Sequence, residues 1–167
     1  YGCLSGTYAR DKDAVVASMI FAEMICYYDS IGKRVYDVLQ DIYKQFGYFV
    51  EKAKSITFGG LDGMQKMADI MSEIRSTSFS EIAGTKVLAQ SDFVTRKKTY
   101  ADGKAEDITL PKTNAFKIHL DNGDWICVRP SGTEPKLKFY VATSKPTQDA
   151  ATALAYSYLA YMENLVK

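Results

Sequence analysis

The chain has 167 residues, with 21 Lys and Arg against 20 Asp and Glu and a net charge of +1. Such a balanced charge gives no support for generic nucleic-acid or membrane-surface binding, which relies on a strongly basic surface. A hydrophobic fraction of 47%, with 13% aromatic residues, excludes an intrinsically disordered chain. The length suits about one domain, or one small domain plus a piece of another.

The cysteine content indicates a reducing environment. Cys3, Cys26 and Cys127 are odd in number and lack C-x-x-C spacing, which argues against a disulfide framework and against a structural zinc site. We therefore expect a cytoplasmic protein. The one histidine, His119, leaves no His-rich metal site, and we expect it half exposed on a strand.

We expect no membrane-spanning segment. The longest apolar stretch, residues 14–28, is interrupted by Ser18 and Glu23 and is shorter than the ~20 residues that a span needs. The chain begins with Tyr1 rather than Met, and we interpret it as a fragment of a longer protein.

The first third of the chain predicts two helices. Residues 14–28 follow Asp13, whose carboxylate can cap the free N–H groups of a helix start. This segment is apolar nearly all round, which predicts burial on more than one face. Residues 35–46 carry a single apolar stripe at helical spacing, and Gly47 is a plausible helix end.

The middle of the chain predicts an extended segment over 48–58 and a third helix over 61–75, after the Gly59-Gly60 pair. Residues 86–93 predict a strand. Residues 94–114 carry Lys, Asp, Gly and Pro without a period, and we expect a long connection or a poorly ordered arm.

The last third predicts a hairpin, a strand and a helix. Strands over 116–121 and 125–128 flank Asn122-Gly123, which favours a type I′ turn. A strand over 137–143 follows, and Thr147 can cap a final helix that reaches about Val166. The whole order predicts an α+β fold, in which two helices cover one face of a mostly antiparallel sheet.

The strongest candidate site is the segment Arg-Pro-Ser-Gly-Thr-Glu-Pro-Lys-Leu-Lys over 129–138. It joins two predicted strands, so we expect a tight, exposed loop. Gly132 lets the backbone approach an anion, Ser131 and Thr133 offer hydroxyl groups, and Arg129 offers a planar fork for phosphate oxygens. The alternative is a turn made of ordinary turn-forming residues, with Arg129 as a surface charge.

A second candidate is the segment Arg-Asp-Lys-Asp over 10–13, directly before the first predicted helix. Arg10 and Lys12 could meet an anion at the positive end of the helix dipole. The alternative, which we favour on the sequence alone, is a solvated charge cluster that caps the helix.

Two separate motifs resemble the α-D-phosphohexomutases, which include phosphoglucomutase, phosphomannomutase and phosphoglucosamine mutase. Residues 129–140 resemble their phosphate-binding loop, and residues 1–14 resemble the segment that follows their sugar-binding Glu-x-Ser loop. The resemblance covers the whole chain, which corresponds to about the last third of such an enzyme. It implies that residues 1–46 are the helical tail of the third domain, an α/β domain. Residues 47–167 would then be the complete fourth domain, with a TATA-binding-protein-like fold.

The resemblance implies an enzyme that moves a phosphoryl group between the 1- and 6-positions of a sugar, through a phosphoserine, a sugar bisphosphate such as glucose 1,6-bisphosphate, and Mg²⁺. The fourth domain would close the cleft and hold the phosphate that is not transferred. The residues implied for this grip are Arg129, Ser131, Gly132, Thr133 and Lys138. The resemblance also places Lys12 near the reacting phosphoryl group, with Arg10 beside it.

The chain lacks the family's phosphoserine loop and its Asp-Gly-Asp-x-Asp-Arg metal loop. We therefore expect no metal site and no mutase activity in this chain alone, with the N-terminal domains of the same protein as its missing partners. We also expect self-association through residues 14–28, whose apolar surface would lack its usual cover.

Two other classes of function stay open: a stand-alone module that binds phosphosugars or other anions, and a nucleic-acid module, suggested only by the topology and opposed by the net charge of +1. The motifs leave the sugar open among glucose, mannose, glucosamine and pentose phosphates.

Overall fold

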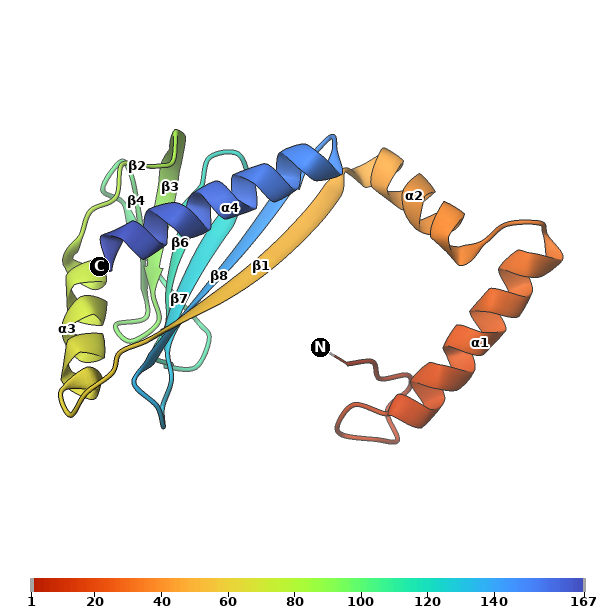
Figure 1. Ribbon diagram of the computed structural model, residues 1–167, viewed down its shortest axis with the longest axis horizontal. Helices are drawn as coiled ribbons and strands as arrows, with labels where there is room; N and C mark the ends of the chain where they lie inside the picture. Colours follow the sequence, from red (N-terminus) through yellow and green to blue (C-terminus); the bar gives the residue numbers. More distant parts are fainter. Residues whose placement is uncertain (1, 167) are drawn as a thin grey trace. The chain divides into compact units, whose positions relative to one another are not determined.

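The computed structural model describes residues 2–166. The chain divides into two compact units, with the boundary between residues 47 and 48. Each unit has its own secondary structure (Figure 1). The first contains two helices, and the second contains a sheet with two further helices.

The first unit contains α1 (Ala14–Ser30) and α2 (Val35–Phe46). Asp13 caps α1 as predicted, because its carboxylate accepts hydrogen bonds from the backbone N–H groups of Val15 and Val16, both at 3.1 Å. At the end of α2, the N–H of Gly47 bonds to the carbonyl of Tyr43 at 2.8 Å.

Neither α1 nor α2 contains a buried residue in this structure, which agrees with the expectation that the apolar surface of residues 14–28 lacks its usual cover in this chain. A helix that is apolar all round needs neighbours on several sides, and within this unit α1 has α2 and the N-terminal segment. Large apolar side chains therefore remain exposed along α1: Val15, Met19, Ile20, Phe21, Ile25 and Tyr27.

Within residues 2–166, no single helix is both long and apolar enough to cross a membrane. The helices α1 and α2 meet the length and composition test only as a pair, and they are bent by 88° relative to each other.

The second unit is built on an antiparallel sheet with the strand order β1-β8-β7-β6-β3-β4-β5, and β2 pairs with β3. This confirms the predicted α+β class with a mostly antiparallel sheet. The strands are β1 (Tyr48–Thr57), β2 (Glu81–Ile82), β3 (Thr85–Asp92), β4 (Lys97–Tyr100), β5 (Ala105–Asp107), β6 (Phe116–Leu120), β7 (Trp125–Pro130) and β8 (Lys136–Lys145).

The helices α3 (Gly63–Ser76) and α4 (Gln148–Leu165) pack on one face of this sheet, and Figure 1 shows α4 lying across it. Thr147 caps α4 as predicted, since its hydroxyl accepts from the N–H of Ala150. One core joins both helices to the inward side chains of the strands. Its fully buried members include Met71, Ile74, Ile118, Ile126, Leu137, Phe139, Tyr158 and Met162.

Within residues 48–166, neither helix of this unit lies on the opposite face of the sheet. Along β8, the core residues Leu137, Phe139 and Val141 alternate with the half-buried Lys138 and Tyr140, which therefore lie on the helix-free face. Cross-strand register places Arg129 and His119 on this same face, opposite Lys138 and Trp125 respectively.

The prediction of an irregular segment over 94–114 is wrong for its first half. Residues there form the β4–β5 hairpin, which extends the sheet at one edge. Apolar alternation is missing because charged pairs link the two strands, Lys97 with Asp107 at 2.7 Å and Lys98 with Glu106 at 2.9 Å.

The predicted type I′ turn at Asn122-Gly123 is also wrong. Gly123 has a φ of 86°, but Asn122 is not among the residues with positive φ. The N–H of Gly123 bonds to the carbonyl of Leu120, which indicates a three-residue loop that ends in a left-handed glycine. Two consecutive positive φ values occur instead at Ala83 and Gly84, in the two-residue loop between β2 and β3.

Candidate functional site

The 131–135 loop connects the end of β7 to the start of β8, as the sequence predicted. Backbone hydrogen bonds hold it. The N–H of Ser131 donates to the carbonyl of Lys136 at 2.8 Å, and the N–H of Lys136 donates to the carbonyl of Glu134 at 2.7 Å. The N–H of Phe58 donates to the carbonyl of Pro135 at 2.8 Å. Because Arg129 and Lys138 are cross-strand partners, their cations stand side by side at the base of the loop.

A small cavity of about 140 Å³ opens at this position. At about 30 Å³ for each water molecule in the liquid, it has room for several waters or for an anion of phosphate size. The cavity brings together four of the predicted residues. Its lining is Arg129, Pro130, Ser131, Gly132, Lys138 and Tyr140.

No carboxylate within residues 2–166 lies within ion-pair distance of the two cations of this cavity. Within residues 2–166, neither Arg129 nor Lys138 forms an ion pair, whereas the neighbouring Lys136 pairs with Glu134 at 2.9 Å. Lys136 and, more weakly, Lys138 lower the pKa of the Glu134 carboxyl. The site therefore presents two unpaired positive charges, the electrostatic condition for binding an anion.

The hydroxyls of Ser131 and Thr133 make no hydrogen bond within the described part of the chain, so both are available to a ligand. Thr133 belongs to the loop but is not part of the cavity lining. Gly132 does not need to be glycine for conformational reasons, because its φ lies outside the left-handed region and a Cβ would meet no atom within 4 Å. Its missing side chain leaves open space beside the cations.

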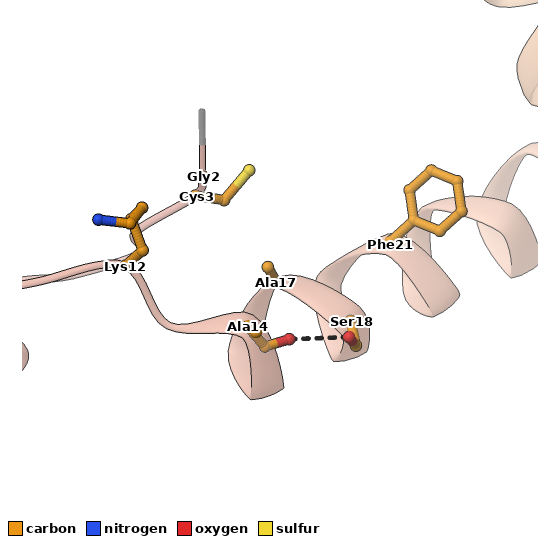
Figure 2. Close-up of a pocket in the computed structure, with 7 residues that line it drawn as sticks. All are labelled: Gly2, Cys3, Lys12, Ala14, Ala17, Ser18 and Phe21. Atoms are coloured by element: carbon orange, nitrogen blue, oxygen red, sulfur yellow. Dashed lines mark hydrogen bonds between the residues drawn. The ribbon is translucent and has the colours of Figure 1, made fainter. Parts of the chain in front are cut away.

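The second candidate site lies in the first unit. Lys12 lines a cavity of about 660 Å³ together with Gly2, Cys3, Ala14, Ala17, Ser18 and Phe21 (Figure 2). A side chain at Gly2 would overlap the methylene groups of Lys12, so glycine permits this close approach. The dashed line in Figure 2 is the bond from the Ser18 hydroxyl to the carbonyl of Ala14, at 2.7 Å.

Lys12 differs from Arg129 and Lys138 in its charge balance. Its ammonium pairs with Asp11 at 2.5 Å, both side chains are exposed, and the hydrogen bond lowers the pKa of Asp11. Arg10 does not line the cavity. The geometry resembles a solvated charge cluster before a capped helix, and a catalytic role for Lys12 or Arg10 stays a prediction.

Two residues that line this cavity, Pro130 and Tyr140, were not among the site residues predicted from the sequence. The available signal for Tyr140 is its spacing: it stands two residues after Lys138 on a strand, so the two side chains share a face. His119 is half-buried as expected, and its Nε2 lies 3.0 Å from the Ser91 hydroxyl.

The part of the chain that the structure describes offers no metal site, because no three His, Cys, Asp or Glu side chains gather within it as metal ligands would. These residues therefore do not fit the Mg²⁺ that the resemblance implies, and we assign the metal no step at this site.

The comparison with known proteins agrees with this architecture. Residues 80–156, which include the 131–135 loop and both flanking strands, match the family model of the phosphoglucomutase/phosphomannomutase C-terminal domain. This match confirms the predicted resemblance to the C-terminal region of a phosphohexomutase.

Curated relatives carry the name phosphoglucomutase. The protein from Staphylococcus epidermidis is 41% identical over 145 residues, which cover 86% of this chain and 26% of that protein. The Staphylococcus haemolyticus protein is 34% identical, covering 95% and 29%. That from Staphylococcus aureus strain RF122 is 37% identical, covering 89% and 27%. The chain thus spans about a quarter of the length of these relatives.

Among solved structures, the solution structure of Chr148 from Cytophaga hutchinsonii aligns with a TM-score of 0.25 at 12% identity, covering 71% of this chain and 88% of that one.

Proposed function

We propose that this chain is the phosphate-gripping, cleft-closing part of a phosphohexomutase of the phosphoglucomutase/phosphomannomutase type. The parent protein would interconvert sugar 1-phosphates and 6-phosphates by intramolecular phosphoryl transfer, through a phosphoserine and a sugar bisphosphate such as glucose 1,6-bisphosphate. The observation that carries the proposal is the pair of unpaired cations, Arg129 and Lys138, at a cavity of phosphate size. The match to the family model supports it.

The roles of the residues follow from their chemistry. The guanidinium of Arg129 can hold two phosphate oxygens at once, and the ammonium of Lys138 adds a point charge from the neighbouring strand. Ser131 and Thr133 donate hydroxyl hydrogen bonds, and Gly132 leaves room for the phosphate to reach the backbone N–H groups. This grip orients the sugar by its unreacted phosphate and supplies no nucleophile.

We propose that the chain by itself lacks mutase activity and binds phosphosugar weakly. Its residues carry neither a phosphoserine loop nor a metal site, and a single clamp gains little over the entropy that binding costs. The Mg²⁺ and the phosphoserine would be supplied by other segments of the parent protein. The three free thiols of Cys3, Cys26 and Cys127 support a cytoplasmic location.

A stand-alone phosphosugar-binding module is the alternative, and the same cavity supports it. The mutase function requires further domains of a parent protein, whereas the binding module would act without them. Phosphosugar conversion by the parent protein that is lost in an Arg129→Ala variant favours the mutase, whereas binding without any conversion favours the module. Turnover by the 167-residue chain alone would contradict our assignment.

The first test is an NMR titration of the 167-residue chain with glucose 1,6-bisphosphate, in which the backbone amides of Ser131, Gly132 and Thr133 are followed. We expect saturable shifts there. Arg129→Ala removes a charged hydrogen bond worth about 1.5–3 kcal/mol, so affinity should fall about tenfold to a hundredfold.

The matched control is Arg34→Ala, because Arg34 is an exposed arginine whose charge is already paired with Asp37 at 2.7 Å. This variant should bind like the wild type. If the loop amides do not shift at millimolar ligand, or if Arg129→Ala binds unchanged, the grip is not at this loop.

A further inference from the structure

One residue that lines the proposed phosphate cavity, Tyr140, is not among the residues expected to bind the phosphate. Tyr140 lines the cavity beside Lys138, on the helix-free face of β8. Its cross-strand partners are Ala53 on β1 and Cys127 on β7, and both are small. The Tyr140 side chain is half-buried between these neighbours, and its accessible part is available to a ligand at the cavity.

The hydroxyl of Tyr140 also lacks a partner. Within residues 2–166 it makes no hydrogen bond, although the side chain is half-buried. Other tyrosines of the same unit are satisfied: Tyr158 bonds to Asp124 at 3.1 Å, and Tyr100 bonds to Glu106 at 2.8 Å. The Tyr140 hydroxyl is not among the buried side-chain atoms that lack a partner within residues 2–166, so it is accessible and free to bond to a ligand at the cavity that Tyr140 lines.

The spacing of residues along β8 sets the distance between the phosphate contact at Lys138 and the side chain of Tyr140. Residues i and i+2 of a strand, such as Lys138 and Tyr140, are about 6.6 Å apart. A phosphate held by Lys138 and Arg129 therefore leaves the sugar that bears it near Tyr140. A sugar ring has the complementary chemistry, since it carries hydroxyls that bond to a phenol and C–H groups that pack on an aromatic face.

We propose that Tyr140 is a specificity-determining residue of this site, which contacts the sugar ring of a bound sugar phosphate and makes the site prefer phosphosugars over inorganic phosphate. The inference rests on the proposed phosphate grip and adds the recognition of the group that bears the phosphate. Tyr140 positions the ligand and takes part in no bond making or breaking.

The test compares two probes, inorganic phosphate and glucose 6-phosphate, by NMR titration of the 167-residue chain. The wild type should bind glucose 6-phosphate more tightly. Tyr140→Phe removes one neutral hydrogen bond and should weaken glucose 6-phosphate binding about two- to tenfold. Tyr140→Ala also removes the ring and should weaken it further, while the affinity for inorganic phosphate stays within about twofold of the wild type in both variants.

Tyr156→Phe is the matched control, because Tyr156 is 56% exposed on α4, which packs on the other face of the sheet. It should change neither affinity. The amide spectrum of Tyr140→Phe checks that the variant is folded, and the phenylalanine keeps the volume of the ring.

The outcomes separate the two proposals. If Tyr140 variants retain the wild-type preference for glucose 6-phosphate, the role of Tyr140 is overturned and the phosphate grip stands. An equal loss of both probes in Tyr140→Phe also overturns it, because the residue would then act on the phosphate or on the fold. If neither probe shifts the loop amides, the proposed grip fails and this inference fails with it.

Discussion

The helices of the first unit are richer in apolar residues than those of the second, yet the second unit is the one whose helices are buried. In the C-terminal unit, α3 and α4 bury side chains such as Met71 and Tyr158 against a sheet. In the N-terminal unit, α1 and α2 bury none, and Phe21 is 54% exposed. An apolar helix is therefore stabilised by the surface it meets, and its own composition does not supply that surface.

The same contrast holds for charge. Lys12 in the N-terminal unit is compensated by its sequence neighbour Asp11, whereas Arg129 and Lys138 in the C-terminal unit share a cavity without a carboxylate. The unit with the closed core is also the one that holds uncompensated cations in fixed positions. A rigid sheet can hold like charges together because cross-strand pairing opposes their separation.

The largest expected effect comes from a pair of matched truncations, Phe139→Ala and Phe21→Ala. Phe139 is fully buried, so its loss should cost about 3–5 kcal/mol of unfolding free energy. Phe21→Ala, at an exposed position, should change it by less than about 0.5 kcal/mol. Urea unfolding followed by the fluorescence of Trp125, the single tryptophan, reports on the C-terminal unit. Equal effects would contradict the difference between the units.

An intermediate effect is expected on association. The exposed side chains of residues 14–28 should make the chain self-associate, because uncovered apolar surface of this kind seeks a partner. Light scattering at high concentration should give a mass above that of one chain, and Phe21→Glu should lower it.

Phe49→Glu is the matched control for association, because Phe49 is 62% exposed but lies on β1 of the other unit. It should leave the mass unchanged. If the wild-type chain has the mass of a monomer at high concentration, the prediction of self-association through residues 14–28 is wrong.

The smallest expected effect concerns the helix-free face of the sheet. Burial, aided by the charges of Lys117 and Lys98, lowers the pKa of His119 to about 4. The unfolded chain keeps an imidazole pKa near 6.5, so it binds a proton that the folded chain does not between about pH 6.5 and pH 4. Stability should therefore fall as the pH falls through this window, and His119→Gln should remove that part of the fall.

His119 is the only histidine, so NMR titration of its imidazole measures this pKa without assignment by mutation. Titration near 6.5 would show that the helix-free face is well solvated, in contrast to the core face.

Local patterns predicted much of both units. Period-two alternation identified β6 and β8, Asp13 and Thr147 identified two helix starts, and Arg129–Lys138 was recognised as a loop between strands. These signals depend on neighbours within a few residues, which the sequence displays directly. The β4–β5 hairpin escaped because charged cross-strand pairs replace the apolar alternation that marks a strand.

What the sequence by itself determined is the order of the helices and of most central strands, the resemblance to the phosphohexomutases, and the loop with its cationic and hydroxyl residues. Tertiary structure alone decided that charged strands form the β4–β5 hairpin, that Arg129 and Lys138 are cross-strand partners, and that Tyr140 lines their cavity. The reason is range: propensity, capping and periodicity act over a few residues, whereas burial and charge compensation depend on which distant segments pairing and packing bring together.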